Sequence, residues 1–151
     1  MKDPYTVLLV EDNEDDAFLV RRALPKCGIF SPVQWVKDGL EAVAYLTAQE
    51  PWTDRTYPEI IVLDLKMPGM SGLDLLGWLR DHAEFQVIPT IVMSSSKHDS
   101  DVRQAYRLGA NTYFVKPSNL DTLAKLVDSV HHYWQLSLRP VGQTRPNSAK
   151  D

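Results

Sequence analysis

Five short runs of apolar, mostly β-branched residues recur along the chain, each followed by polar or turn-forming residues. Runs of four or five such residues are typical of strands that are buried on both faces of a sheet. The predicted strands are residues 6–10, 32–36, 60–63, 90–93 and 112–115.

Between these strands, apolar residues recur at spacings of three and four, which predicts amphipathic helices. Gly109 is expected to end the fourth helix in a left-handed conformation, and Asn119 to cap the start of the fifth. The residues that mark the five helices are Phe18, Leu19 and Leu24; Leu40, Val43, Ala44 and Leu46; Leu73, Leu76 and Leu79; Val102, Ala105 and Leu108; and Leu120, Leu123, Val127, Val130 and Trp134.

Strands that alternate with helices of this length pair in parallel, because each crossover returns the next strand in the same direction. The predicted fold is therefore α/β, a doubly wound (βα)5 arrangement with a five-stranded parallel sheet covered on both faces. A length of 151 residues fits one domain. We assign that domain to residues 1–138 and a flexible, polar C-terminal tail to residues 139–151, and we expect the long connection at 49–59 to be an ordered surface loop.

Composition and charge exclude several classes of protein. The single cysteine, Cys27, cannot form an internal disulfide, which suits a reducing compartment. Sixteen basic and twenty acidic residues give a net charge of -4 without a basic cluster, so nucleic-acid binding is not expected. The first apolar run is too short for a signal peptide or a membrane span, and we expect a cytoplasmic protein that does not bind membranes.

Polar residues of a particular kind follow four of the five predicted strands. Glu11 and Asp12 follow the first strand, Asp64 the third, Ser94 the fourth and Lys116 the fifth. In an open parallel sheet, ligands bind beyond the carboxyl ends of the strands. We therefore expect these side chains to form a site there.

Carboxylates that converge in this way repel one another unless they protonate, separate or bind a cation. A pocket of oxygen ligands without nearby His or Cys favours a hard divalent cation, most naturally Mg²⁺. A carboxylate screened by a metal and a lysine can accept a phosphoryl group, and Asp64 with Lys116 fits that role.

Each residue alone has an ordinary interpretation. The acidic residues of VEDNEDD also suit the first turn of a helix, where the helix dipole favours negative charge. Asp64 precedes Leu-Lys-Met-Pro-Gly and would fit a turn, and Lys116 alone would be a surface lysine. The coincidence at four separated strand ends favours a functional site.

Four segments, LLVEDNEDD, IIVLDLKMPGMSGLDLL, PTIVMSSS and GANTYFVKPSN, resemble the receiver domain of two-component response regulators. The resemblance covers residues 5–133 and implies a flavodoxin-like sheet of strand order 2-1-3-4-5. It also implies that Asp64 accepts a phosphoryl group from a histidine kinase. Mg²⁺ or Mn²⁺ would then be the cofactor.

The resemblance assigns further roles at the same site. Glu11 and Asp12 match the acidic metal-binding pair, with Asp12 the direct ligand, while Lys66 would add its backbone carbonyl to the metal. Lys116 matches the lysine that pairs with the phosphoryl oxygens, and its bond to Pro117 is expected to be cis. Ser94 matches the hydroxyl that moves to the phosphoryl group.

Tyr113 matches the aromatic residue that follows this hydroxyl, although a serine after a strand or a tyrosine in the last strand also occurs as ordinary packing. The sequence departs from the common pattern at Glu11, where aspartate is usual, so that its metal contact could pass through water. It departs again at Lys66, which is expected to place an extra ammonium beside the phosphoryl group.

The expected function is that of a single-domain response regulator that is not a classical enzyme and catalyses only its own phosphorylation and dephosphorylation. Expected partners are a sensor histidine kinase, of the phytochrome or hybrid type, and a second copy bound through the fourth helix, fifth strand and fifth helix. The main alternative is a degenerate receiver that binds proteins without phosphorylation. Nucleotide or flavin binding would need glycines after the first strand, and VEDNED has none. A phosphatase would need its nucleophile on the first strand.

Overall fold

A computed structural model describes residues 5–24 and 30–138 of the chain. Its strands pair in parallel in the order β2-β1-β3-β4-β5, which confirms the predicted α/β fold and strand order. The strands are β1 Tyr5–Val10, β2 Phe30–Val36, β3 Ile60–Leu63, β4 Thr90–Ser94 and β5 Thr112–Val115.

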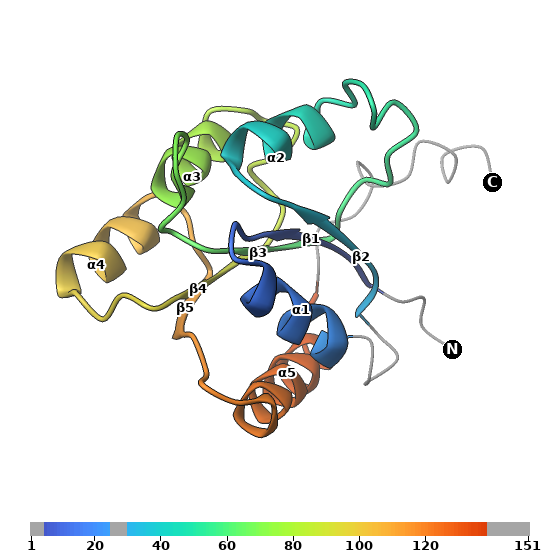
Figure 1. The fold of residues 1–151 in the computed structure, drawn as a ribbon. Helices are drawn as coiled ribbons and strands as arrows, with labels where there is room; N and C mark the ends of the chain where they lie inside the picture. Colours follow the sequence, from blue (N-terminus) through green and yellow to red (C-terminus); the bar gives the residue numbers. More distant parts are fainter. Residues whose placement is uncertain (1–4, 25–29, 139–151) are drawn as a thin grey trace.

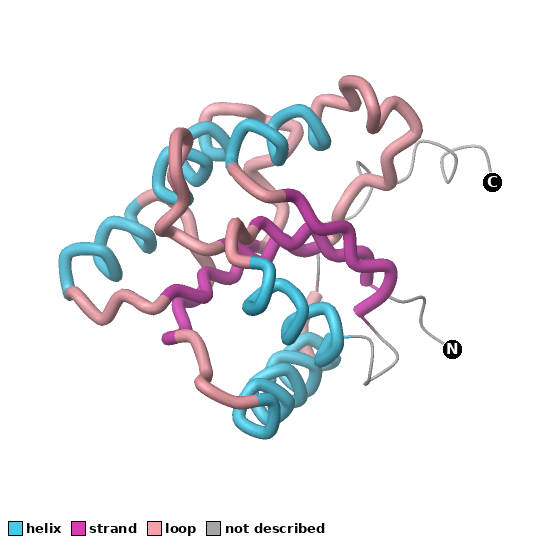
Figure 2. The backbone as a smooth tube through the Cα atoms, viewed as in Figure 1, coloured by secondary structure: helices cyan, strands magenta, loops and turns pink. Residues whose placement is uncertain are grey.

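Five helices within residues 5–24 and 30–138 cover the two faces of the sheet. Helices α2, α3 and α4 lie on one face and α1 and α5 on the other (Figures 1 and 2). No helix in the described part of the chain is long and apolar enough to span a membrane. The helices are α1 Glu14–Ala23, α2 Gly39–Leu46, α3 Gly72–Arg80, α4 Asp99–Arg107 and α5 Leu120–Gln135.

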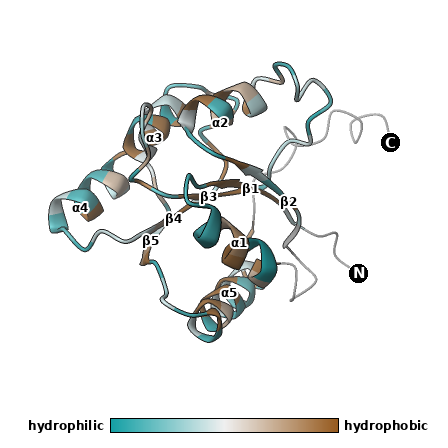
Figure 3. Ribbon diagram, viewed as in Figure 1, coloured by the Kyte–Doolittle hydropathy of each residue, from teal (hydrophilic) through white to brown (hydrophobic). Residues whose placement is uncertain are grey.

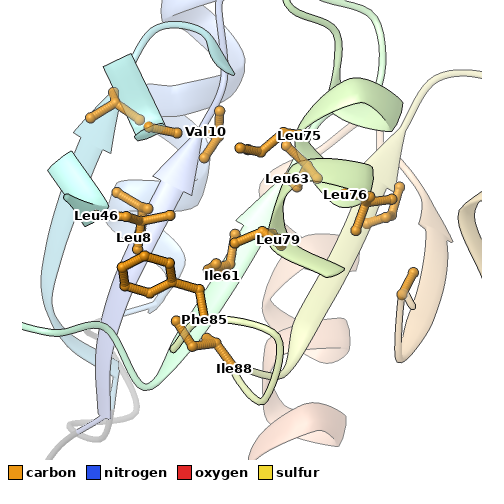
Figure 4. Close-up of a cluster of buried hydrophobic side chains, with 14 of the residues drawn as sticks. Leu8, Val10, Leu46, Ile61, Leu63, Leu75, Leu76, Leu79, Phe85 and Ile88 are labelled. Carbon is orange, nitrogen blue, oxygen red and sulfur yellow. The ribbon is translucent and has the colours of Figure 1, made fainter. Parts of the chain in front are cut away.

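The alternation of side chains along each strand gives the molecule two hydrophobic cores. In β1, Leu8 and Val10 face the core under α2 and α3, whereas Val7 and Leu9 face the core under α1 and α5. Figure 4 shows the first core, and Figure 3 shows the central strands β1 and β3 between the cores in the colour of hydrophobic residues. Burial on both faces explains why β1, β3 and β4 read as continuous apolar runs.

Polar side chains fix the helix ends. The Asn13 side chain accepts a hydrogen bond from the Asp16 amide (2.9 Å), and Asn119 caps α5 through the Thr122 amide (2.8 Å), as predicted. Gly109 follows α4 with a φ of 102°, which confirms the predicted left-handed conformation.

The structure departs from the predicted elements in small ways. Strands β1 and β2 begin earlier than predicted, and β4 includes Ser94, because the Lys116 amide donates to the Ser94 carbonyl and extends the ladder. Phe18 and Leu40 mark helices but are exposed. Small residues such as Ala17 and Ala42 are buried in their place, since they let the helices approach the sheet closely.

The loop at 49–59 is ordered, as expected. The Tyr45 hydroxyl donates to the Thr56 carbonyl (2.7 Å), and the Arg55 guanidinium donates twice to the Leu46 carbonyl (2.8 and 3.1 Å). The predicted tail at 139–151 lies outside the described residues, so the boundary at residue 138 stays a prediction.

Candidate phosphoryl and metal site

The order of the strands brings the predicted acidic residues together. Strands β1 and β3 are neighbours, with Val10 opposite Leu63, and the ladder continues as the Asp64 amide donates to the Val10 carbonyl (3.0 Å). Glu11 and Asp12 therefore emerge beside Asp64 at the carboxyl edge of the sheet. This is the edge at which the sequence predicted a site.

The three carboxylates form a compact cluster. One oxygen of each of Glu11, Asp12 and Asp64 lies within 4.8 Å of the others. Glu11 and Asp64 are only 3% and 5% exposed, whereas Asp12 is open to solvent. A set of carboxylate oxygens that is open on one side fits Mg²⁺ or Mn²⁺, which keep water ligands of their own.

Lys116 reaches this cluster from β5, across the intervening strand β4. Its ammonium contacts Glu11 Oε1 at 2.9 Å, Asp16 Oδ2 at 2.8 Å and Asp64 Oδ2 at 3.2 Å. The Lys116 side chain thus connects the ends of β3 and β5, which the sequence analysis assigned to one site. Lys116 neutralises part of the negative charge that the cluster concentrates.

Burial and charge shift the pKa values of two of these groups. Burial, with the neighbouring Asp64 charge, raises the pKa of Glu11 to about 7, although the Lys116 ammonium opposes the shift. Burial alone would lower the pKa of Lys116, but its hydrogen bonds to Asp16 and Glu11 and the charge of Asp64 raise it above its ordinary value. The lysine therefore stays cationic at neutral pH.

Ser94 and Tyr113 both contact the segment after β4. Ser94 is fully buried, and its hydroxyl oxygen accepts a hydrogen bond from the Ser96 amide (3.2 Å). The Tyr113 hydroxyl donates to the Ser96 carbonyl (2.9 Å). The two predicted switch residues are thus linked through one residue, and the Ser94 hydroxyl is engaged with the backbone.

The Lys66 side chain pairs with a residue outside the carboxylate cluster. Its ammonium pairs with Asp101 of α4 at 3.3 Å, instead of standing beside Asp64 as expected. The Ser96 hydroxyl donates to the same Asp101 oxygen (2.5 Å), and this bond and Lys66 hold the pKa of Asp101 below its usual range. Asp101 offers the ammonium a partner that sequence spacing does not reveal.

The expected cis bond between Lys116 and Pro117 is wrong. Among the described residues, the cis peptide bond lies between Glu50 and Pro51. Lys116 reaches its carboxylates with the trans bond, which is the intrinsically favoured form before proline.

Gly72 allows the β3–α3 connection to pack tightly beside the site. A Cβ atom at this position would lie 2.2 Å from the Asp64 carbonyl oxygen and 2.6 Å from Leu65 Cα. Only glycine lets the first turn of α3 approach the backbone of Asp64 so closely.

Sequence reasoning missed two contacts at the site. Asp16 binds Lys116, but its place in an acidic first turn suggested a helix-dipole role only. The Trp35 indole donates to the Glu11 carbonyl (2.7 Å) from the neighbouring strand β2. Asp12 precedes the N-cap of α1 and lies outside the helix, so no helical spacing relates it to Asp16, and none could have found the first contact.

Comparison with known proteins identifies the family. The model of the "Response regulator receiver domain" family matches residues 7–128. "Probable methanogenesis regulatory protein FilR2" of Methanothrix harundinacea (strain 6Ac) is 34% identical over 133 residues, which cover 88% of this chain and 85% of that protein. "Response regulator Rcp1" of Synechocystis sp. is 33% identical over 131 residues, covering 87% and 89% of the two chains.

Solved structures agree in fold along nearly the whole chain. The crystal structure of the phosphorylated cyanobacterial phytochrome response regulator RcpA has a TM-score of 0.84 at 31% identity, covering 91% of this chain and 99% of that one. The Mn(2+)-bound form of response regulator Rcp1 has a TM-score of 0.82 at 32% identity, covering 91% and 100%. With its parallel sheet and its cluster of acidic residues beside a lysine, the chain belongs to the response regulator receiver domain family.

Proposed function

We propose that Asp64 accepts a phosphoryl group from a histidine kinase and that the modification changes which partners the protein binds. One observation carries this proposal: Asp64 is nearly buried, lies in a carboxylate cluster, and is contacted by an ammonium from two strands away. A carboxylate placed only to cap a helix or close a turn does not need these neighbours.

The transfer is a displacement at phosphorus. An Asp64 carboxylate oxygen forms a bond to phosphorus while the phosphorus–nitrogen bond of the phosphohistidine breaks, and the leaving imidazole nitrogen keeps the electron pair and takes up a proton. A divalent cation would supply charge screening of the phosphoryl oxygens. Glu11, Asp12 and Asp64, with the Lys66 carbonyl, would hold it, and Lys116 would pair with a phosphoryl oxygen.

Ser94 and Tyr113 are proposed to carry the change to the surface. The Ser94 hydroxyl would leave the Ser96 amide and donate to the phosphoryl group, while Tyr113 follows through its bond to Ser96. One charge-assisted hydrogen bond contributes about 1.5–3 kcal/mol. Since a shift from 1:99 to 99:1 needs about 5.5 kcal/mol, Lys116 and the loop backbone must contribute the remainder.

The direct test is labelling with a small phosphodonor. Incubation with Mg²⁺ and acetyl phosphate is expected to add one labile group of about 80 Da, the mass of a phosphoryl group, as seen by intact mass spectrometry. The adduct should require Mg²⁺ and be absent from Asp64→Asn. Asp121→Asn, which removes an exposed aspartate from the first turn of α5, is the matched control and should label normally. An unlabelled wild type would favour a phosphorylation-independent binding module.

We propose that the protein acts in the cytoplasm and that its partner is a sensor histidine kinase of the phytochrome or hybrid type. The support is the likeness to RcpA, which is described as a phytochrome response regulator, and to Rcp1.

We also propose a homodimer through α4, β5 and α5. Its support is the apolar surface exposed there, which includes Tyr106 and Val115.

A further inference from the structure

Lys116 has one carboxylate partner that stands apart from the acidic cluster. An ammonium has three N–H donors, and that of Lys116 faces three carboxylates, from Asp16, Glu11 and Asp64. Glu11 and Asp64 belong to the group of oxygens that could hold a metal ion, and Asp16 does not. The contact with Asp16 is also the shortest of the three, at 2.8 Å.

The fold holds Asp16 in place. It is the third residue of α1, and its amide donates to the side chain of the N-cap residue Asn13 (2.9 Å). The next residue, Ala17, is buried against the sheet and fixes the rotation of the helix. The Asp16 carboxylate therefore faces Lys116 from a rigid element, although the two residues are 100 positions apart in the sequence.

A divalent cation in the cluster would change the surroundings of Lys116. The oxygens of Glu11 and Asp64 would turn to the cation, so the ammonium would lose two acceptors and gain a positively charged neighbour. Asp16 would remain as its only carboxylate partner among those it now contacts. Two of its three N–H donors would then be free.

We propose that Asp16 is a positioning residue, which keeps the Lys116 ammonium beside Asp64 when a divalent cation occupies the cluster. The two freed donors can then meet the oxygens of the incoming phosphoryl group. This inference rests on the proposed function, since it assigns a task in phosphoryl transfer. It differs from a helix-dipole role, which any acidic residue of the first turn can fill.

Asp15 provides a matched control for Asp16. It carries the same charge in the same helical turn, is exposed, and makes no contact with Lys116 in the described structure. Asp15→Asn and Asp16→Asn therefore remove the same dipole interaction, but only Asp16→Asn removes the charged partner of the ammonium, leaving a neutral amide.

The first measurement is the rate of labelling by acetyl phosphate at saturating Mg²⁺. We expect Asp16→Asn to be slower than wild type by about tenfold, the effect of losing a hydrogen bond to a charged group. Asp15→Asn should stay within about twofold, as expected for an exposed charge. Equal rates for the two variants in a protein that labels would overturn the inference and leave the proposed function standing.

The second measurement needs no phosphodonor. In protein carrying 15N-labelled lysine, a held ammonium exchanges its protons slowly and gives a side-chain signal, which Lys116→Ala assigns by its loss. With Mg²⁺, we expect this signal in wild type and Asp15→Asn but not in Asp16→Asn. Without Mg²⁺, Asp16→Asn should show it, because Glu11 and Asp64 still hold the ammonium.

The two measurements separate the possible failures. A signal that persists in Asp16→Asn with Mg²⁺ would overturn the inference, whatever the labelling rate. A wild type that takes no label would overturn the proposed function, while the ammonium signal would still decide whether Asp16 holds Lys116.

Discussion

Glu11 shows how burial sets the chemistry of a single residue at this site. It follows a buried strand, so its carboxylate is withdrawn from water beside the charge of Asp64, and its pKa rises to about 7. The folded protein therefore binds this proton more tightly than the unfolded chain does. Without a divalent cation, the contribution of Glu11 to stability is present below pH 4.5 and is lost as the pH rises toward 7.

The same shift predicts a pH-dependent affinity for Mg²⁺, because the cation binds the ionised carboxylate. Between pH 6 and pH 8, the ionised fraction of a group with a pKa of about 7 rises about tenfold, and the affinity should rise by a similar factor. Isothermal titration calorimetry across this range measures it. Glu11→Gln should make the affinity for Mg²⁺ nearly independent of pH, whereas Glu14→Gln, at an exposed position, should leave the pH dependence unchanged. If the affinity of Glu11→Gln depended on pH as steeply as that of wild type, another group would be responsible for the titration.

The sequence predicted which residues follow the strands, but not every contact they make. Glu11, Asp64 and Lys116 were predictable, because the carboxyl ends of parallel strands share one edge of the sheet. The direction of Lys66 was not, since its partner Asp101 lies on α4, whose position depends on packing between distant elements. The Lys116–Asp16 contact depends in the same way on how α1 is rotated against the sheet.

The two glycines of helix α3 differ in the space around their Cα atoms. Gly72 lies against the Asp64 backbone, whereas a Cβ at Gly77 would meet nothing within 4 Å. Gly72→Ala should destabilise the protein by about 1–3 kcal/mol, because backbone atoms must move to make room. Gly77→Ala should stabilise it by about 0.5–1 kcal/mol, the difference in helix propensity.

Urea unfolding of the two variants and wild type measures this difference. The expected order of stability is Gly77→Ala, wild type, Gly72→Ala. If Gly72→Ala were as stable as wild type, the close approach of α3 to Asp64 would not be a constraint on the site.

Helix α4 is held less firmly than α3, although both have nine residues. Helix α4 buries Ala105 only, whereas α3 buries Gly72, Leu75, Leu76 and Leu79. The Lys66–Asp101 pair at the start of α4 has a largely exposed lysine, and exposed ion pairs add little to stability. This makes α4 the more easily moved of the two helices.

Native-state hydrogen exchange measures the difference between these helices. The amides of α4 should exchange faster than those of α3 under the same conditions, because local opening exposes less buried apolar surface. Equal protection of the two helices would contradict a mobile α4. Ser94 and Tyr113 would then lack a nearby helix that can move in response to phosphorylation.

At the scale of elements, sequence reasoning came within two residues of the strand boundaries, but two of the residues that mark the helices, Phe18 and Leu40, are exposed. The strand boundaries follow the ends of the apolar runs. Phe18 and Leu40 are exposed because size alone does not decide the buried face; the alanines beside them allow closer packing.

The whole molecule carries the acidic site at one edge of the sheet and an exposed apolar surface on α4 and β5. If this surface joins two copies, Val115→Asp should weaken the dimer, because it would bury a charge without a partner. Val87→Asp is the matched control, since Val87 lies outside α4, β5 and α5 and is 41% exposed against 42% for Val115.

Analytical ultracentrifugation across a concentration series, with and without acetyl phosphate and Mg²⁺, measures the association. We expect wild type and Val87→Asp to associate and Val115→Asp to remain monomeric over the same range. A wild type that stays monomeric in both conditions would contradict the proposed dimer.

Locating the phosphoryl group on the chain tests the central claim most directly. After brief incubation with Mg²⁺ and acetyl phosphate, borohydride reduces an aspartyl phosphate to homoserine, which tandem mass spectrometry of the peptides can assign to one position. The expected result is homoserine at position 64 in wild type and none in Asp64→Asn. Homoserine at another aspartate, or at no position in a protein that binds Mg²⁺, would contradict the assignment of Asp64 as the acceptor.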